Sequence, residues 1–505
     1  MEQLFKKKLV RLSGCALDKQ EECPISGEYT LPEYCADVAV VLKCFAYPRI
    51  LSRQWSGDQL LVDGNAVIRV LYLDEQRHCV HAIEFLQPFT CSMRGERQAD
   101  HALVDLDLST KYLNCRAIGP RRVEVRGAVT ITARADGVLE KDIGWIAEDG
   151  GLYTRTLHKN VTIPCVMNEK LLTISETLDF PDVLPAAEVL LGGECRAVVH
   201  ECKLLTGKAI VKGQIYVHQL YLDTKEMVHC LDFALPFSQI LDVSEVVDGM
   251  PYYATVQVLS DTERCAVGPS GENTILDVSV KLLLQVQMYR QEEITVIKEA
   301  FHRQYPVAAQ MENMDFCCHL GTRWEETVLP MQLTIPQGRW QEIIDVSVQP
   351  QEGITECLEG NAVNKGRMTV CVVARDADGE VVYDEFVEDY VLTYTCQGNA
   401  VRVHLVPINC KYRVVENALD LQVSLCATVQ DMQYECESVL SDLRLQSDRP
   451  YPQQKVTAWL YYADAGENVW DVGRSCCASP ACIFEENHLS DENIAQSSVL
   501  IVPMH

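Results

Sequence analysis

The sequence predicts a mainly β chain of three tandem antiparallel β domains, followed by a small C-terminal domain with the order strand, helix, helix, strand. Three observations predict this fold class. A motif recurs about every 150 residues, apolar and polar residues alternate within each copy, and the end of the chain carries helix-start signals. Of the 505 residues, 48% are hydrophobic, so each domain can bury a core.

The repeated motif is clearest in its first two copies. Leu60–Met93 contains "VDGNAVIRVLYLD" and "FLQPF", and Ala209–Leu241 contains "VKGQIYVHQLYLD" and "FALPF"; Ala362–Phe386 is a weaker third copy. In every copy a glycine precedes an aspartate by ten residues: Gly64 and Asp74, Gly213 and Asp223, Gly366 and Asp376. Such self-similarity at a fixed interval indicates repeated structural units.

Alternation within the copies predicts strands. From Val62 to Tyr72 every second residue is apolar or glycine, and Asp63, Asn65 and Arg69 fall on the opposite face. This period of two is typical of antiparallel sheets with one covered face. The dipeptide at 378–379, Asp-Gly, lies between two apolar runs and predicts a hairpin turn.

Each copy is flanked by a proline-containing segment upstream and a second alternating segment downstream, which sets the expected domain limits. We expect the three domains at residues 1–160 (core 29–143), 161–310 (core 178–301) and 311–446. A polar linker over residues 447–454 and a closing domain over 455–505 complete the chain.

The closing domain has clear local signals. Asn468 and Ser479 are favoured helix N-caps, and Pro480 occupies the first helical position, where proline is preferred. "KVTAWLYY" before them and "SVLIVP" (Ser498–Pro503) after them alternate as strands.

This order of elements and the residues within it resemble the LysM domain. The residues that match its pattern are Gly466, Trp470, Asn487, Leu489, Ile494, Leu500, Val502 and Pro503. Glu467, Asn468 and the pair Ser497–Ser498 depart from it, in the loops that hold N-acetylglucosamine chains in LysM domains. The resemblance implies a partner-binding face, which we place at Gly466, Glu467, Asn468, Trp470, Asn487, His488 and Leu489.

For two of those residues, the sequence allows two different roles. Trp470 is either a partner anchor, since tryptophan is favoured in binding hot spots, or packing of a very small domain. Asn487 either orders the loop after the second helix or contacts a ligand.

Each unit in the body of the chain begins with a segment in which proline follows an apolar residue. Together with the "LYLD" and "PF" motifs, these segments resemble the SPOCS domain of spore-forming Firmicutes. Three such repeats before a LysM domain resemble SipL-type spore coat morphogenetic proteins. The resemblance implies a non-enzymatic scaffold in the mother-cell cytoplasm, at the forespore surface. Its LysM-like domain would dock onto a SpoIVA-like coat ATPase, and its SPOCS repeats would tether coat components. The alternative is a peptidoglycan-binding protein that uses the LysM domain on N-acetylglucosamine polymers.

Charge and cysteine usage agree with a cytoplasmic expectation. A net charge of −28 repels phosphate backbones, so we expect no nucleic-acid partner. Several of the 23 cysteines, such as Cys371 and Cys426, fall inside apolar strand patterns and are expected to be reduced and buried. The start of the chain has no apolar run typical of a secretory signal, and no stretch is long enough to span a bilayer.

We expect neither catalysis nor a metal or other cofactor. The sequence holds no nucleophile elbow, phosphate-binding glycine loop or HExxH motif. "HCVH" at His78–His81 and "CCH" at Cys317–His319 are the candidate metal ligands, but His78 and His81 would point to opposite faces of a strand. A cysteine-dependent or zinc enzyme stays open as the third hypothesis.

Overall fold

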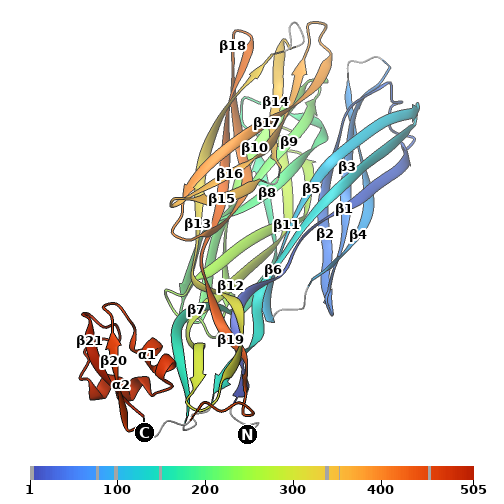
Figure 1. Cartoon of the computed structure of the whole chain (residues 1–505). Coiled ribbons are helices and arrows are strands. Elements are labelled where there is room, and N and C mark those ends of the chain that lie inside the picture. The colour runs from blue at the N-terminus through green and yellow to red at the C-terminus, as the bar shows by residue number, and fades with distance from the viewer. Residues whose placement is uncertain are drawn as a thin grey trace.

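The computed structural model describes residues 5–75, 79–95, 100–146, 151–335, 340–351, 353–452 and 456–504. They form an elongated body of long antiparallel strands with a small α/β unit beside one end (Figure 1). The prediction of a mainly β chain is confirmed. Among the described residues, the short helices α1 and α2 both lack the length and apolar character of a bilayer-crossing helix.

The body consists of three modules, each a sandwich of two small sheets around one core. Module 1 pairs sheet β1-β6-β5 with sheet β2-β3-β4, module 2 pairs β7-β12-β11 with β8-β9-β10, and module 3 pairs β13-β19-β18 with a sheet centred on β16. All pairings are antiparallel. The strand that is continuous as β2 and β8 is divided into β14 and β15 in module 3.

The strands have the following bounds. Module 1 contains β1 (Phe5–Thr30), β2 (Val40–Ser56), β3 (Gln59–Leu73), β4 (Val80–Arg94), β5 (Asp100–Gly119) and β6 (Arg122–Ile146). Module 2 contains β7 (Leu152–Asp179), β8 (Ala187–Leu205), β9 (Lys208–Asp223), β10 (Val228–Asp242), β11 (Tyr252–Ala266) and β12 (Ile275–His302). Module 3 contains β13 (Val307–Thr334), β14 (Glu342–Pro350), β15 (Ile354–Leu358), β16 (Asn361–Arg375), β17 (Val381–Thr395), β18 (Ala400–Val415) and β19 (Ala418–Leu445). The expected division after residue 160 lies inside β7, and that after residue 310 lies inside β13.

The packing explains the glycine and the "PF" of the repeated motif. Gly64 lies opposite Phe89 on the neighbouring strand, and a Cβ on Gly64 would lie 2.3 Å from the phenyl ring. Gly213 has the same relation to Phe237, with a distance of 2.5 Å. The missing side chain therefore leaves the space that a cross-strand aromatic ring fills.

The aspartate that ends the motif closes a hairpin. The Asp223 carboxylate accepts the backbone N–H groups of Lys225 and Met227, at 2.8 and 2.9 Å. Asp376 accepts those of Asp378 and Glu380 in the same way. These bonds satisfy the turn backbone between the strand that carries the motif and the strand after it.

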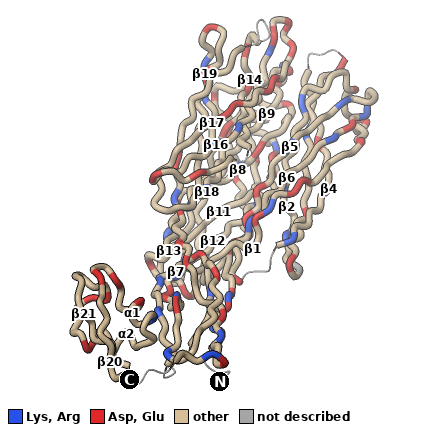
Figure 2. Tube along the Cα trace, in the orientation of Figure 1, with Lys and Arg blue, Asp and Glu red and all other residues tan. Residues whose placement is uncertain are grey.

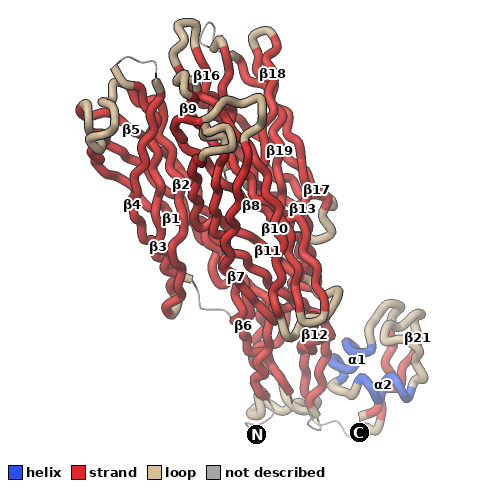
Figure 3. Tube along the Cα trace, turned by 180° about the vertical axis from the view of Figure 1, so that it is seen from behind, coloured by secondary structure: helices blue, strands red, loops and turns tan. Residues whose placement is uncertain are grey.

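The three modules lie side by side (Figures 1 and 3), and they share two apolar clusters. Equivalent strands of all three modules contribute to each cluster. The upper axial cluster contains Leu71, Leu73, Val80, Leu191, Leu220, Leu222, Val228, Val373 and Val381. The lower axial cluster, formed by the long strands, contains Val10, Leu12, Ile143, Val161, Ile163, Val296, Met314, Phe316 and Val439. The modules therefore close a ring with approximate threefold symmetry.

Polar contacts repeat around the same ring. In each junction, β3/β4 or its equivalent pair in one module faces β8, β14 or β2 of the next. The contacts are Arg69 to the Gly193 carbonyl at 2.6 Å, His218 Nε2 to Asp345 Oδ2 at 3.3 Å, and the ion pair of Lys43 with Glu385. The last of these joins module 3 back to module 1.

The C-terminal unit comprises β20 (Ala458–Ala463), α1 (Val469–Cys476), α2 (Pro480–Glu486) and β21 (Ser498–Pro503). β20 and β21 pair antiparallel, and the two helices pack on one face of this ribbon. Asn468 caps α1 and Ser479 caps α2. Acidic and basic residues are interspersed along the body, whereas the charged residues of the C-terminal unit are mostly acidic (Figure 2). Residues 456–504 hold seven acids and Arg474 as their one Lys or Arg: Asp464, Glu467, Asp471, Glu485, Glu486, Asp491 and Glu492.

Candidate functional site

Trp470, the most distinctive residue of the expected partner-binding face, packs against the body. Its side chain is part of α1, yet it lies outside the core of the C-terminal unit. The indole N–H donates to Glu299 on β12 at 2.9 Å, and the ring meets Phe301 edge-on with 5.0 Å between centroids. Only 8% of Trp470 is exposed. Module 2 therefore supplies much of its burial.

Further polar contacts hold the unit against β12 and the residue that follows it. Arg474 Nη1 donates to the same Glu299 carboxylate at 2.8 Å, and Arg303 donates to the Met504 carbonyl. Figure 1 shows α1 facing the ends of β7 and β12. The contact is thus mainly a small set of hydrogen bonds and one aromatic pair.

The other residues before α1 are used in local structure. Gly466 has φ +91° and donates its N–H to the Ile494 carbonyl at 2.8 Å, which closes the loop against the opposite segment. Glu467 accepts the Tyr461 hydroxyl and the Asp464 N–H. Asn468 accepts the Trp470 backbone N–H at 2.9 Å, as an N-cap does.

The residues after α2 form the other side of this loop pair. Asn487 donates to the Ile483 and Ile501 carbonyls at 2.8 and 2.7 Å and accepts the Ile501 N–H at 2.7 Å. Its amide therefore ties α2 to β21 and orders the loop. His488 follows with φ +49°, and Leu489 is partly buried against the core of the unit.

The outer face of the β20–β21 ribbon is apolar and exposed. Leu460 lies directly opposite Ile501, and Tyr462 opposite Val499. Leu460 and Tyr462 are 66% and 78% exposed. We name these four residues the ribbon patch. The sequence expectation missed it, although the alternation in "AWLYYA" places Leu460 and Tyr462 on the face opposite Trp459 and Tyr461.

A cavity of about 310 Å³, with several charged side chains in its lining, lies where the three modules meet. Arg402 of module 3 pairs with Asp136 of module 1, and Arg134 Nε donates to the same carboxylate at 3.1 Å. Burial alone raises the pKa of Asp136, but Arg402 and Arg134 outweigh it, so the pKa is lowered. Tyr253 of module 2 donates to Asp105 at 3.0 Å. These paired charges join the modules.

Two clusters in the body combine a thiol with carboxylates. In the first, Cys195 donates to Glu263 at 3.3 Å, and Asp261 is held by Arg49. Burial, followed by Asp261 and Glu263, raises the pKa of the Cys195 thiol. A thiol held in its protonated form is a weak nucleophile, which counts against a catalytic cysteine here.

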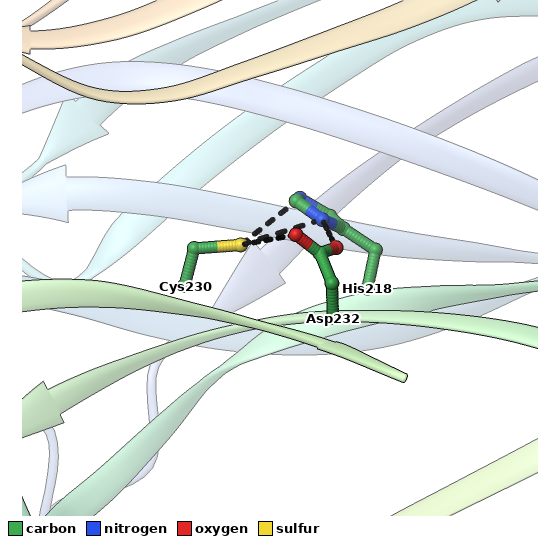
Figure 4. A group of neighbouring side chains, drawn as sticks. All are labelled: His218, Cys230 and Asp232. Atoms are coloured by element: carbon green, nitrogen blue, oxygen red, sulfur yellow. Dashed lines mark hydrogen bonds and ion pairs between the residues drawn. The ribbon is translucent and has the colours of Figure 1, made fainter. Parts of the chain in front are cut away.

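The second cluster contains His218 on β9 and Cys230 and Asp232 on β10, whose side chains converge (Figure 4). His218 Nδ1 lies 2.8 Å from Asp232 Oδ1 and 3.4 Å from Cys230 Sγ. Burial lowers the pKa of His218, but the carboxylates of Asp345 and Asp232 outweigh it and raise it well above its usual value. Burial raises the pKa of Cys230 to about 11.

The two groups of candidate metal ligands named from the sequence, at 78–81 and 317–319, are not members of this cluster. His78 lies outside the described residues, and His81 Nε2 contacts Asp74 at 3.4 Å. Cys317 is buried whereas His319 is exposed. Sequence reasoning missed the His218 cluster because His218 is twelve residues or more from Cys230 and Asp232 in the chain. The residues meet only through the β9–β10 pairing, which sets His218 opposite Asp232.

All 23 cysteines are free thiols in this structure, and ten are buried in the modules or in α1. Their burial agrees with the expectation that many serve as small apolar side chains.

Part of the chain matches a known protein family. Residues 187–262 match the family model described as SipL, SPOCS domain. The matched segment begins at the first residue of β8 and runs through β9 and β10 into β11, so it covers the central part of module 2. The match supports the SipL-type resemblance of the sequence. Searches among curated proteins and solved structures gave no match.

Proposed function

We propose that this protein is a non-enzymatic scaffold in spore coat assembly. The observation that carries the proposal is the SPOCS match over residues 187–262, which falls on one module of an architecture that occurs three times in the chain. The raised pKa of the Cys195 thiol and the paired charges of the central cavity add support, because both features suit structural roles.

We further propose that modules 1 and 3 are SPOCS domains and that the C-terminal unit is a LysM domain. Modules 1 and 3 share the strand order of module 2 and its glycine-aspartate motif. The C-terminal unit has the order β20-α1-α2-β21 and the matching residues described for its sequence. The boundaries are those of the modules, with the linker after β19.

In this proposal the C-terminal unit docks onto a SpoIVA-like coat ATPase at the forespore surface, in the mother-cell cytoplasm, and the modules tether coat components. The ribbon patch and the acidic surface of the unit are available for a partner while Trp470 is engaged with β12. Aromatic and aliphatic side chains rimmed by charge are typical of protein-binding surfaces.

Truncation tests the addressing role. A fluorescent fusion that ends before Gln454 removes the whole C-terminal unit and leaves all three modules. We expect the full chain to encircle the forespore and the truncated chain to be diffuse, while circular dichroism and thermal unfolding of the purified truncated chain show a folded β body. Normal forespore localisation of the folded, truncated chain would refute the addressing role.

A pull-down separates the two proposed classes of partner. The full chain is incubated in parallel with purified peptidoglycan and with the coat ATPase, and Tyr462→Ala, which removes the most exposed aromatic ring of the ribbon patch, serves as the variant. We expect retention on the ATPase, reduced by Tyr462→Ala. Retention on peptidoglycan alone would replace the scaffold proposal with the glycan-binding alternative.

A further inference from the structure

The three junctions of the ring place charge at the same positions of the repeated motif. Glu84, Asp232 and Glu385 each stand directly before the phenylalanine of their copy. In the junction of modules 1 and 2, Arg69 pairs with Glu84 at 2.9 Å. In the junction of modules 3 and 1, Lys43 pairs with Glu385. Both junctions therefore neutralise this acid with a base that is charged at neutral pH.

The junction of modules 2 and 3 lacks such a base at either position. His218 stands where module 1 has Arg69, five residues after the motif glycine. Asp345 stands opposite Val373 on β16, the position at which Lys43 stands opposite Leu71 in module 1. The Asp345 side chain is only 8% exposed. An acid thus replaces the lysine at this junction.

Neighbouring groups do not remove the excess of negative charge. In the described part of the chain, the Asp232 and Asp345 carboxylates both pair with His218. Arg196 on β8 is close, but it is paired with Glu194 at 2.7 Å and donates to carbonyls of module 3. Two carboxylates in a partly desolvated site require a positive charge between them.

The donor atoms are arranged as ligands of a small cation. His218 Nδ1, Cys230 Sγ and the Asp232 carboxylate lie within 4.8 Å of one another. Cys230 Sγ lies 3.4 Å from His218 Nδ1 and 3.9 Å from Asp232 Oδ2. Zinc bonds of about 2.3 Å to sulfur and 2.0 Å to nitrogen or oxygen require ligand separations of roughly 3.3 to 3.6 Å at tetrahedral angles. Small side-chain movements would bring all three onto one ion.

The second histidine nitrogen has the partner that a metal-bound imidazole needs. Nε2 faces Asp345 Oδ2 at 3.3 Å, across the module junction. A carboxylate that accepts the remaining N–H fixes the ring and strengthens its donor atom. The cluster lies in the wall of a cavity of about 200 Å³, which leaves room for water as a fourth ligand.

We propose that His218, Cys230 and Asp232 bind a zinc-class divalent cation, with Asp345 orienting His218, and that this ion ties module 2 to module 3. A thiolate, an imidazole and one carboxylate select zinc over magnesium or calcium, which prefer oxygen ligands. Binding displaces the protons of the Cys230 thiol and of His218 Nδ1, and the ion supplies at this junction the positive charge that Arg69 and Lys43 supply at the other two.

Metal content tests the site directly. The full chain, purified without a histidine tag, is incubated with Zn²⁺, dialysed and assayed by elemental analysis. We expect about one tightly held zinc per wild-type chain, a loss of at least about fivefold in Cys230→Ser, and full retention in the control Cys436→Ser, which removes an exposed thiol elsewhere. With Co²⁺, the thiolate charge-transfer band should appear in the wild type and be absent in Cys230→Ser.

A second variant keeps the test valid if Cys230→Ser misfolds. His218→Arg copies the Arg69 arrangement, so it restores a permanent cation while removing the ligand. We expect His218→Arg to fold, to hold no zinc, and to have a melting temperature that does not respond to a chelator, whereas the chelator lowers that of the wild type by about 2 °C or more.

Equal zinc retention by the wild type and Cys230→Ser, or a wild-type melting temperature that ignores both zinc and chelator, would overturn the proposal. In that case a protonated His218 is the cation of this junction. Neither outcome depends on the proposed function, since the test measures metal and stability without any coat partner.

Discussion

The modules are joined to one another by one kind of contact, and the C-terminal unit is joined to the body by another. The modules share two apolar clusters to which all three contribute, including the fully buried Phe316. The C-terminal unit meets the body through Trp470, Arg474 and the Met504 carbonyl. A cluster shared by three modules cannot be opened at one junction alone, whereas a contact of a few hydrogen bonds and one aromatic pair can. The body is therefore built as one framework, and the unit as a separable attachment.

The largest effect should come from the shared core. Phe316→Ala empties a ring-sized volume in the lower axial cluster and should cost about 3–5 kcal/mol of unfolding free energy. We expect the melting transition of the body to fall by several degrees in calorimetry. Val328→Ala, on the same strand but 57% exposed, should change the unfolding free energy by less than about 0.5 kcal/mol. Equal effects of the two variants would contradict the shared-core description.

The next effect concerns the charges of the central cavity. Asp136→Asn leaves Arg402, whose side chain is 26% exposed, without its anionic partner. We expect a loss of about 1.5–3 kcal/mol, the usual range for a hydrogen bond to a charged group. Denaturant unfolding at neutral pH measures this loss. An unchanged unfolding midpoint would show that the Arg402–Asp136 pair does not join modules 3 and 1.

The same pair predicts a pH dependence. Because the pKa of Asp136 is lower in the folded chain than its unfolded value of about 3.9, the unfolded state binds the proton first on acidification. The stabilisation is complete above about pH 5 and is lost as the pH falls through the folded pKa. The difference in unfolding free energy between the wild type and Asp136→Asn should therefore shrink below pH 4. A difference that stays constant to pH 3 would contradict this assignment.

A smaller effect is expected where the C-terminal unit meets β12. Trp470→Ala removes the hydrogen bond to Glu299 and the contact with Phe301, together about 1–3 kcal/mol of docking free energy. Because Trp470 lies outside the core of the unit, the unit should stay folded while it detaches. Small-angle scattering should show a larger radius of gyration, and limited proteolysis should cut faster between the body and the unit.

Tyr462→Ala is the matched control for undocking, since Tyr462 is an aromatic residue of the same unit on the exposed ribbon patch. It should leave both scattering and proteolysis unchanged. If Trp470→Ala instead unfolds the unit, Trp470 is part of its core and the separable-attachment description fails.

The smallest effect is expected for Arg474→Gln. Arg474 pairs with Glu299 but is 53% exposed, so solvent screens the pair and its contribution should be about 0.2–1 kcal/mol. At low salt, Arg474→Gln should be cleaved slightly faster in the linker than the wild type. At high salt this difference should disappear, because salt then screens the ion pair of the wild type. A loss as large as that of Trp470→Ala would mean that the ion pair, not the indole, holds the unit.

Local features of the fold could be predicted from the sequence because they depend on short-range chemistry. The alternation around Ile68 predicts β3, whose residues are alternately buried, and Asn468 predicts the start of α1, which it caps. The motif glycines were recognised as a repeat, but their relation to the cross-strand aromatic rings required the register of β3 and β4.

Contacts between distant segments could not be predicted in this way. The ring depends on which face of each module is turned to the next, and Leu71 and Val373 show no sequence signal for meeting Leu220. Docking of Trp470 on Glu299 joins residues 171 positions apart. The His218 cluster adds Asp345 from another module, so neither spacing nor motif indicates it.

Closure of the ring also has a consequence for biosynthesis. Lys43 and Glu385 are 342 positions apart, so the ring cannot close until the ribosome has made most of the chain. Until then, the apolar faces of modules 1 and 2 that form the axial clusters stay open to solvent in the nascent polypeptide. Such late, non-local pairing slows folding and leaves apolar surface exposed, which is the kind of surface that chaperones bind.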